Sequence, residues 1–90
     1  MLDEPLQDVV DVLQAAFPSG PGSDYMPLLA VLHDELSEEN LGLVMEAFAG
    51  VDQYIAVHDA VDAITKKRPS PADISRVRAL LEENGWTEDD

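Results

Sequence analysis

Few side chains in this 90-residue chain have the type and spacing that catalysis or metal binding requires. The two histidines are His33 and His58, and His58 precedes Asp62 by four residues, so these two could meet on one face of a helix. A metal site would need one or two further ligands from elsewhere in the fold. His33, Asp34 and Glu35 are consecutive, so on a helix they point in different directions. We expect no metal, no cofactor and two partly exposed histidines.

Nucleophilic catalysis has no better support in the sequence. The chain has no cysteine, which excludes a thiolate nucleophile, a disulfide and a cysteine-based metal site. The serines belong mostly to expected turns and helix caps, and none has a Gly-x-Ser-x-Gly context. The "SGPGSD" segment follows an expected helix and not a strand, which is not the setting of a phosphate-binding loop. We therefore predict that the protein is not an enzyme.

The charge of the chain is strongly acidic and unevenly distributed. It has 19 acidic and 5 basic residues and a net charge of −14. Residues 1–65 contain no Lys or Arg, and all the cations follow: Lys66, Lys67, Arg68, Arg76 and Arg78. Such a surface repels nucleic acid and anionic lipids and favours a basic partner or no partner at all; the charge is also explained by solubility alone. A helix-turn-helix DNA-binding role is also disfavoured, because Arg76 and Arg78 do not share a helix face.

The elements that would position these residues are helices. Apolar residues recur at helical spacing along most of the chain, and no segment alternates like a strand. We predict an all-α fold, a compact bundle of about five short helices forming one domain over residues 1–86, with a disordered acidic tail at 87–90. The first helix is expected from Glu4 to Phe17 and the second from Tyr25 to Glu35. Ser37, Asp52 and Ser70 are expected to begin the other three.

Capping residues and apolar stripes support these boundaries. Asp24 is expected to cap the second helix, and Gly50 to end the third. The stripe of the first helix is Leu6, Val9, Val10, Leu13 and Phe17; that of the fourth is Tyr54, Val57, Val61 and Ile64. The second helix is apolar all round, which is typical of a helix buried at the centre of a fold.

The basic triplet Lys66-Lys67-Arg68 has a structural interpretation and a functional one. We expect it in the last turn of the fourth helix, where cations interact favourably with the terminal carbonyl groups by about 0.3–1 kcal/mol each. With Arg76 and Arg78 it could instead bind a partner. Tyr25 and Trp86 are likewise either binding anchors or residues that close the core at its ends. For Trp86 the sequence predicts a Schellman motif, with Gly85 left-handed and a contact to Leu81.

Two blocks, "FPSGPGSDYMPLLAVLHDELSEENL" and "SPADISRVRALLEENGW", resemble a small all-helical family from actinobacteria, mycobacteria especially, known as domain of unknown function 3349. The resemblance covers about residues 10–86. It implies a compact bundle of about five helices with no assigned enzymatic activity or catalytic residues. Members look similar in topology to short helical repeats that bind bacterial cell wall in phage lysozymes, a likeness of fold alone.

The function we predict is a small interaction module whose partner is a protein or a second copy of the chain. The alternative is recognition of a cell-wall glycopeptide, peptidoglycan, through an aromatic-lined groove. The N-terminal "MLDEPLQDVV" is acidic where a signal peptide would be basic, and no apolar run is long enough to cross a bilayer. We therefore expect a soluble, cytoplasmic protein that binds neither nucleic acid nor membrane.

Overall fold

The computed structural model describes residues 4–86, which form five α-helices and one short 3₁₀ turn. The elements are α1 (Glu4–Ala16), η1 (Gly22–Asp24), α2 (Tyr25–Glu35), α3 (Glu38–Ala49), α4 (Gln53–Ile64) and α5 (Pro71–Glu83). This part of the chain contains no strand, so the predicted all-α fold is confirmed. None of its helices is long and apolar enough to cross a membrane. The predicted tail, residues 87–90, lies outside the described residues.

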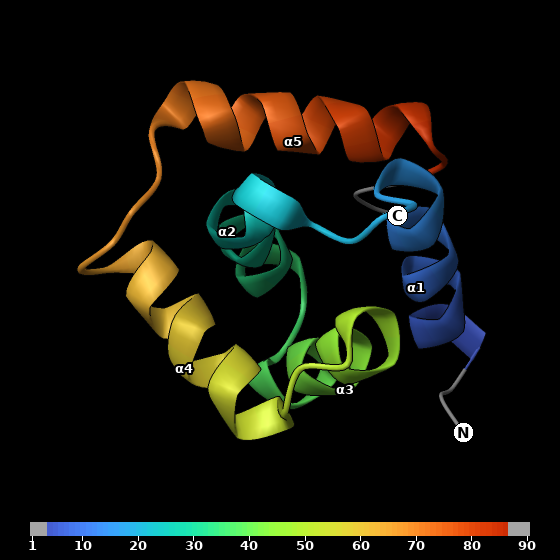
Figure 1. The fold of residues 1–90 in the computed structure, drawn as a ribbon, viewed down its shortest axis with the longest axis horizontal. Helices are drawn as coiled ribbons and strands as arrows, with labels where there is room; N and C mark the ends of the chain where they lie inside the picture. The colour runs from blue at the N-terminus through green and yellow to red at the C-terminus, as the bar shows by residue number, and fades with distance from the viewer. Residues whose placement is uncertain (1–3, 87–90) are drawn as a thin grey trace.

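Helix α2 occupies the centre of the molecule. Figure 1 shows it nearly end-on, with α1, α3, α4 and α5 arranged around it. It packs against α3, α4 and α5, while α1 closes the ring by packing on α3 and α5. Its central side chains are completely buried: Leu28, Leu29, Val31 and Leu32. The sequence prediction of a central, all-round apolar helix is confirmed, because only burial removes every side of such a helix from water.

Helix α1 presents its predicted stripe to the core. Leu6, Val10, Leu13 and Phe17 are buried, and Val9 packs against them from a half-buried position. The ring of Phe17 lies 6.4 Å from that of Phe48 at a tilt of 56°, an arrangement that aromatic pairs favour. This contact joins the end of α1 to the end of α3.

Three of the predicted helix starts are formed as expected. The Ser37 and Ser70 hydroxyl groups accept hydrogen bonds from the backbone N–H groups three residues on, at 3.2 and 3.1 Å. The Asp52 carboxylate accepts from the Tyr54 N–H at 2.9 Å. Gly50 ends α3 with a φ of 71°, a conformation that glycine adopts without steric cost. Local capping therefore determines where α3, α4 and α5 begin.

The predicted cap of α2 is wrong. Asp24 occupies the N-cap position, but its side chain accepts no hydrogen bond from the helix backbone. The preceding turn η1 already supplies acceptors, since the Asp24 and Tyr25 N–H groups bond to the Pro21 and Gly22 carbonyls. The carboxylate is therefore available to another donor, and Arg76 of α5 takes it.

The end of α5 has the predicted Schellman motif. The Trp86 N–H donates to the Leu81 carbonyl at 2.9 Å, and the Gly85 N–H donates to that of Glu82 at 3.2 Å. Gly85 has a φ of 104°, which the motif requires and which other residues rarely adopt. The motif turns Trp86 back onto the core, where it is only 8% exposed.

Helix α4 does not bury the predicted stripe. Its fully buried residues are Ala56, Ala60 and Ala63, which recur at i, i+4 and i+7 on a different face. Small side chains let α4 approach α2 and α3 closely, because the distance between packed helices depends on the residues at the contact. Tyr54 and Val61, assigned to the stripe from the sequence, are exposed as a result.

Leu32→Ala should reduce the free energy of unfolding by about 2–5 kcal/mol, because it leaves a cavity in the central helix. A domain of this size has a total stability of roughly 5 kcal/mol, so the variant should be close to unfolded. Urea denaturation followed by circular dichroism measures the loss. Ile55→Ala on the exposed side of α4 is the control, with an expected change below about 0.5 kcal/mol. Equal losses in the two variants would contradict the central position of α2.

Candidate functional site

Arg76, predicted as a possible partner-binding residue, forms ion pairs within the domain. Its guanidinium donates to both carboxylate oxygens of Asp24, at 2.7 and 3.1 Å, and to Asp73 at 3.3 Å. The hydrogen bond and charge of Arg76 lower the pKa of Asp24 below its ordinary value, and the carboxylates raise the pKa of Arg76 in return. Arg76 therefore connects α5 to the beginning of α2.

Arg78 connects α5 to the opposite end of α2. Its guanidinium lies 3.3 Å from the Glu35 carboxylate and 3.5 Å from that of Asp34. Residues two apart on a helix project to opposite sides, and α5 crosses α2 steeply, as Figure 1 shows. Arg76 and Arg78 thus reach both ends of the central helix from one crossing point. Arg76 and Arg78 project to different sides of α5, which disfavoured a DNA-binding face. In this fold the same arrangement lets the two residues hold α5 against α2.

The sequence prediction for the basic triplet is wrong: Lys66, Lys67 and Arg68 lie beyond the last turn of α4. Helix α4 ends at Ile64, because the Thr65 hydroxyl and the Lys67 N–H fold back onto the Val61 and Asp62 carbonyls. Only Arg68 retains the expected role, since its guanidinium donates to the Ile64 carbonyl at 3.4 Å. The side chains of Lys66 and Lys67 are exposed and form no ion pair with residues 4–86.

The two aromatic residues considered as anchors are partly or fully withdrawn from solvent. The Tyr25 hydroxyl donates to the Asp59 carboxylate at 2.8 Å, which joins α2 to α4. Burial and this hydrogen bond raise the pKa of Tyr25 above its ordinary value of 10.0. Trp86 is buried, and its indole N–H has no hydrogen-bond acceptor among residues 4–86. Both side chains occupy structural positions in this fold.

The histidines occupy different surroundings. His33 is largely buried, and its Nε2 lies 3.5 Å from the Glu38 carboxylate. His58 is exposed, with Nδ1 at 3.6 Å from Asp59 and 3.7 Å from Asp62. One ligand atom from each of these three α4 residues lies within 4.8 Å of the others, so they are the described side chains that could hold a metal ion. The i, i+4 spacing predicted His58 and Asp62; Asp59 joins them because Tyr25 orients its carboxylate.

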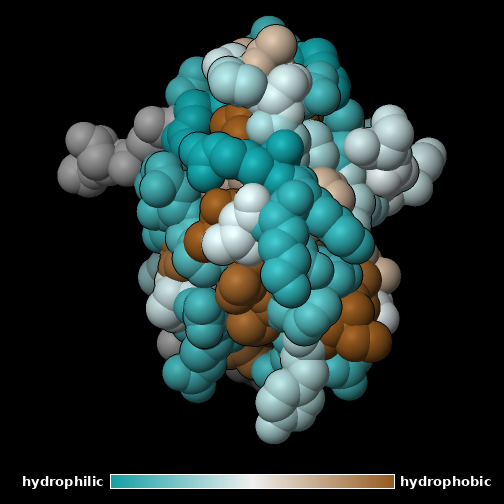
Figure 2. Space-filling model, turned by 90° about the vertical axis from the view of Figure 1, so that its left-hand side faces the viewer, coloured by the Kyte–Doolittle hydropathy of each residue, from teal (hydrophilic) through white to brown (hydrophobic). Residues whose placement is uncertain are grey.

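The surface feature that the sequence did not indicate is the outer side of α4. Tyr54 is 88% exposed, Ile55 55% and Val61 36%, and these are the large hydrophobic side chains left exposed among the described residues. We call these three residues the α4 face. Figure 2 shows hydrophobic side chains grouped between polar ones on this side of the molecule. Isolated exposed apolar residues are common in soluble proteins, but here two large ones are consecutive in the first turn of α4.

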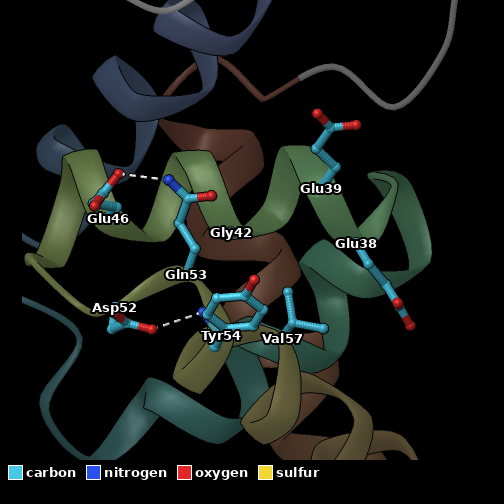
Figure 3. A pocket seen from close by; sticks show the side chains of 8 residues that line it. All are labelled: Glu38, Glu39, Gly42, Glu46, Asp52, Gln53, Tyr54 and Val57. Atoms are coloured by element: carbon cyan, nitrogen blue, oxygen red, sulfur yellow. Dashed lines mark hydrogen bonds between the residues drawn. The ribbon is translucent and has the colours of Figure 1, made fainter.

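A groove of about 500 Å³ lies beside the α4 face, between α3 and α4. Figure 3 shows Tyr54 and Val57 on its α4 side and three glutamates, Glu38, Glu39 and Glu46, along α3. Asp52 adds a fourth carboxylate, and Gln53 and Gly42 complete the lining. The groove therefore combines apolar side chains with four carboxylates, and its described lining residues include no Lys or Arg.

The comparison with protein families gives a match over residues 4–90 to the model described as "Protein of unknown function (DUF3349)". The chain belongs to the DUF3349 family. The match confirms the family predicted from the "FPSGPGSDYMPLL" and "SPADISRVRALLEENGW" blocks, while the actinobacterial origin stays a prediction. No curated protein and no solved structure matches the chain. The DUF3349 description assigns no function to the family.

Arg76→Gln should make the free energy of unfolding depend less on pH in the acid range. Because the folded-state pKa of Asp24 is depressed, the pair stabilises the fold above the ordinary value of 3.8, and this stabilisation is lost as the pH falls through the lower folded value. The variant should be less stable near neutral pH and should lose less stability below pH 3.8. Urea titrations across this range test it, with Arg68→Gln as the control for charge. Identical acid transitions in Arg76→Gln and wild type would refute the pairing.

Proposed function

We propose that this domain is a protein-interaction module, not an enzyme, and that it binds a basic segment of a partner protein through the α4 face. The single observation that carries the proposal is the exposure of Tyr54 and Ile55, two consecutive residues in the first turn of α4. Core packing explains their exposure, since the residues that α4 buries completely are its alanines on another face. In the isolated domain, however, Tyr54 and Ile55 do not contribute to the buried core.

The apolar side chains would provide most of the binding energy. Burial of apolar surface contributes about 25 cal/mol per Å², and tyrosine is enriched among residues that dominate interfaces. Tyr54 can contribute ring contacts and a hydroxyl group at the same time. The α4 face is therefore suited to a partner that covers it with apolar groups of its own.

The acidic surroundings define the charge of the partner. A domain with a net charge of −14 attracts cations over long range and repels acidic proteins, nucleic acid and anionic membranes. The same charge opposes association of two copies. Among the described residues, Lys66, Lys67 and Arg68 are the exposed cations that form no ion pair and could attract the acidic surface of a second molecule. An external basic protein is thus favoured over self-association.

The cell-wall alternative, which a likeness of fold suggested, has less support from the aromatic side chains of this domain. An aromatic-lined groove for a glycopeptide would need accessible rings, but Trp86 is buried and Tyr25 is bound to Asp59. Tyr54 alone does not distinguish a glycan from a protein. We therefore retain the protein partner as the proposed ligand.

Nuclear magnetic resonance can test the proposal with the ¹⁵N-labelled domain and a synthetic amphipathic peptide rich in lysine and arginine. Shift changes should concentrate in α4 and the adjoining half of α3. Tyr54→Ala/Ile55→Ala should weaken binding by about tenfold, because it removes the central apolar contacts, while the melting temperature stays nearly unchanged.

An acidic peptide of the same length and apolar pattern is the control and should not bind. Shift changes spread evenly over all acidic helices, or unchanged affinity in the double variant, would contradict a defined binding face. Sedimentation equilibrium of the free domain distinguishes an external partner from self-association, because self-association predicts a concentration-dependent dimer.

A further inference from the structure

We propose that the groove between α3 and α4 receives an arginine side chain of the partner. This inference rests on the proposed interaction role and adds the residue type that the domain would select. It concerns the groove beside the α4 face, whose lining combines the carboxylates of Glu38, Glu39, Glu46 and Asp52 with Tyr54 and Val57.

The carboxylates of the groove are incompletely neutralised within the domain. Glu39 has no hydrogen bond or ion pair with the described residues, and no Lys or Arg lines the groove. Glu46 accepts from the Gln53 amide through Oε1 at 2.8 Å, and Asp52 caps α4 through Oδ1. Figure 3 shows both hydrogen bonds. Each leaves its second oxygen without a donor from residues 4–86, so an incoming cation would find acceptors already held in place.

The apolar side of the groove favours a guanidinium over an ammonium group. Tyr54 and Val57 lie on the α4 side, and the glutamates lie along α3 with the side chains of Glu38 and Glu39 pointing in different directions, as Figure 3 shows. A guanidinium is planar and weakly hydrated, stacks on an aromatic ring and donates two parallel hydrogen bonds to a carboxylate. A lysine ammonium is a strongly hydrated point charge and gains less from such a site. The pairing of ring and carboxylates therefore indicates arginine.

Gly42 forms the part of the lining where α3 lies against the first turn of α4. A Cβ atom at this position would lie 3.2 Å from Cβ of Gln53 and 3.5 Å from Cγ2 of Val57. Glycine therefore lets the first turn of α4 approach α3, which brings Tyr54 and the glutamates to one groove. The same closeness allows Gln53 to hold the Glu46 carboxylate.

The experiment compares three peptides that differ at one position: arginine, lysine or citrulline, the neutral isostere of arginine. Isothermal titration calorimetry with the intact domain should rank the affinities arginine above lysine above citrulline. Glu39→Gln/Glu46→Gln should weaken binding of the arginine peptide by about fivefold, since each exposed ion pair contributes modestly. The same variant should leave the affinity for the citrulline peptide within about twofold.

Asp8→Asn/Asp11→Asn is the matched control, because it removes the same charge from exposed positions of α1, on the opposite side of α2 in Figure 1. This control variant should change the affinity for the arginine peptide by no more than about twofold. Equal affinities for arginine and citrulline, or equal losses in the two double variants, would overturn the arginine site while binding at the α4 face could still be observed. Failure of every basic peptide to bind the wild-type domain would overturn both proposals.

Discussion

The burial of α2 is the interaction on which the other features depend. This helix is apolar on all sides, so it has no favourable position at a surface and must be covered by other helices. α3, α4 and α5 contact it directly, and α1 packs across α3 and α5. The arrangement in Figure 1 follows from this requirement more than from the individual propensities of the helices.

The need to bury α2 also explains two unexpected features: the ion pairs of the α5 arginines with residues of α2 and its N-cap, and the exposed apolar side chains of α4. α5 contributes only Val77 and Leu81 as fully buried side chains, and its Arg76 and Arg78 hold the two ends of α2 through acidic residues. α4 contacts α2 through alanines, which bring the helices close but provide no place for the larger side chains. Close packing on one side of α4 thus exposes Tyr54 and Ile55 on the other.

Local signals in the sequence predicted the helices well, because caps and stops act within a few residues. Ser37, Asp52, Ser70, Gly50 and Gly85 all act as their residue types indicate. The inner face of α4 was mispredicted, since hydrophobic periodicity gives large side chains more weight than alanines that pack closely. Asp24 was mispredicted because its partner, Arg76, is 52 residues away in sequence. The groove between α3 and α4 depends equally on tertiary packing, so spacing alone could not predict it.

Native-state amide hydrogen exchange measures the dependence of the fold on α2 most directly. If burial of α2 organises the domain, its central amides should be the slowest to exchange, and they should open only with global unfolding. The amides of α5, which buries fewer side chains, should open at a lower free energy. Exchange from α2 that is as fast as exchange from α5, while the remaining helices stay protected, would contradict the account.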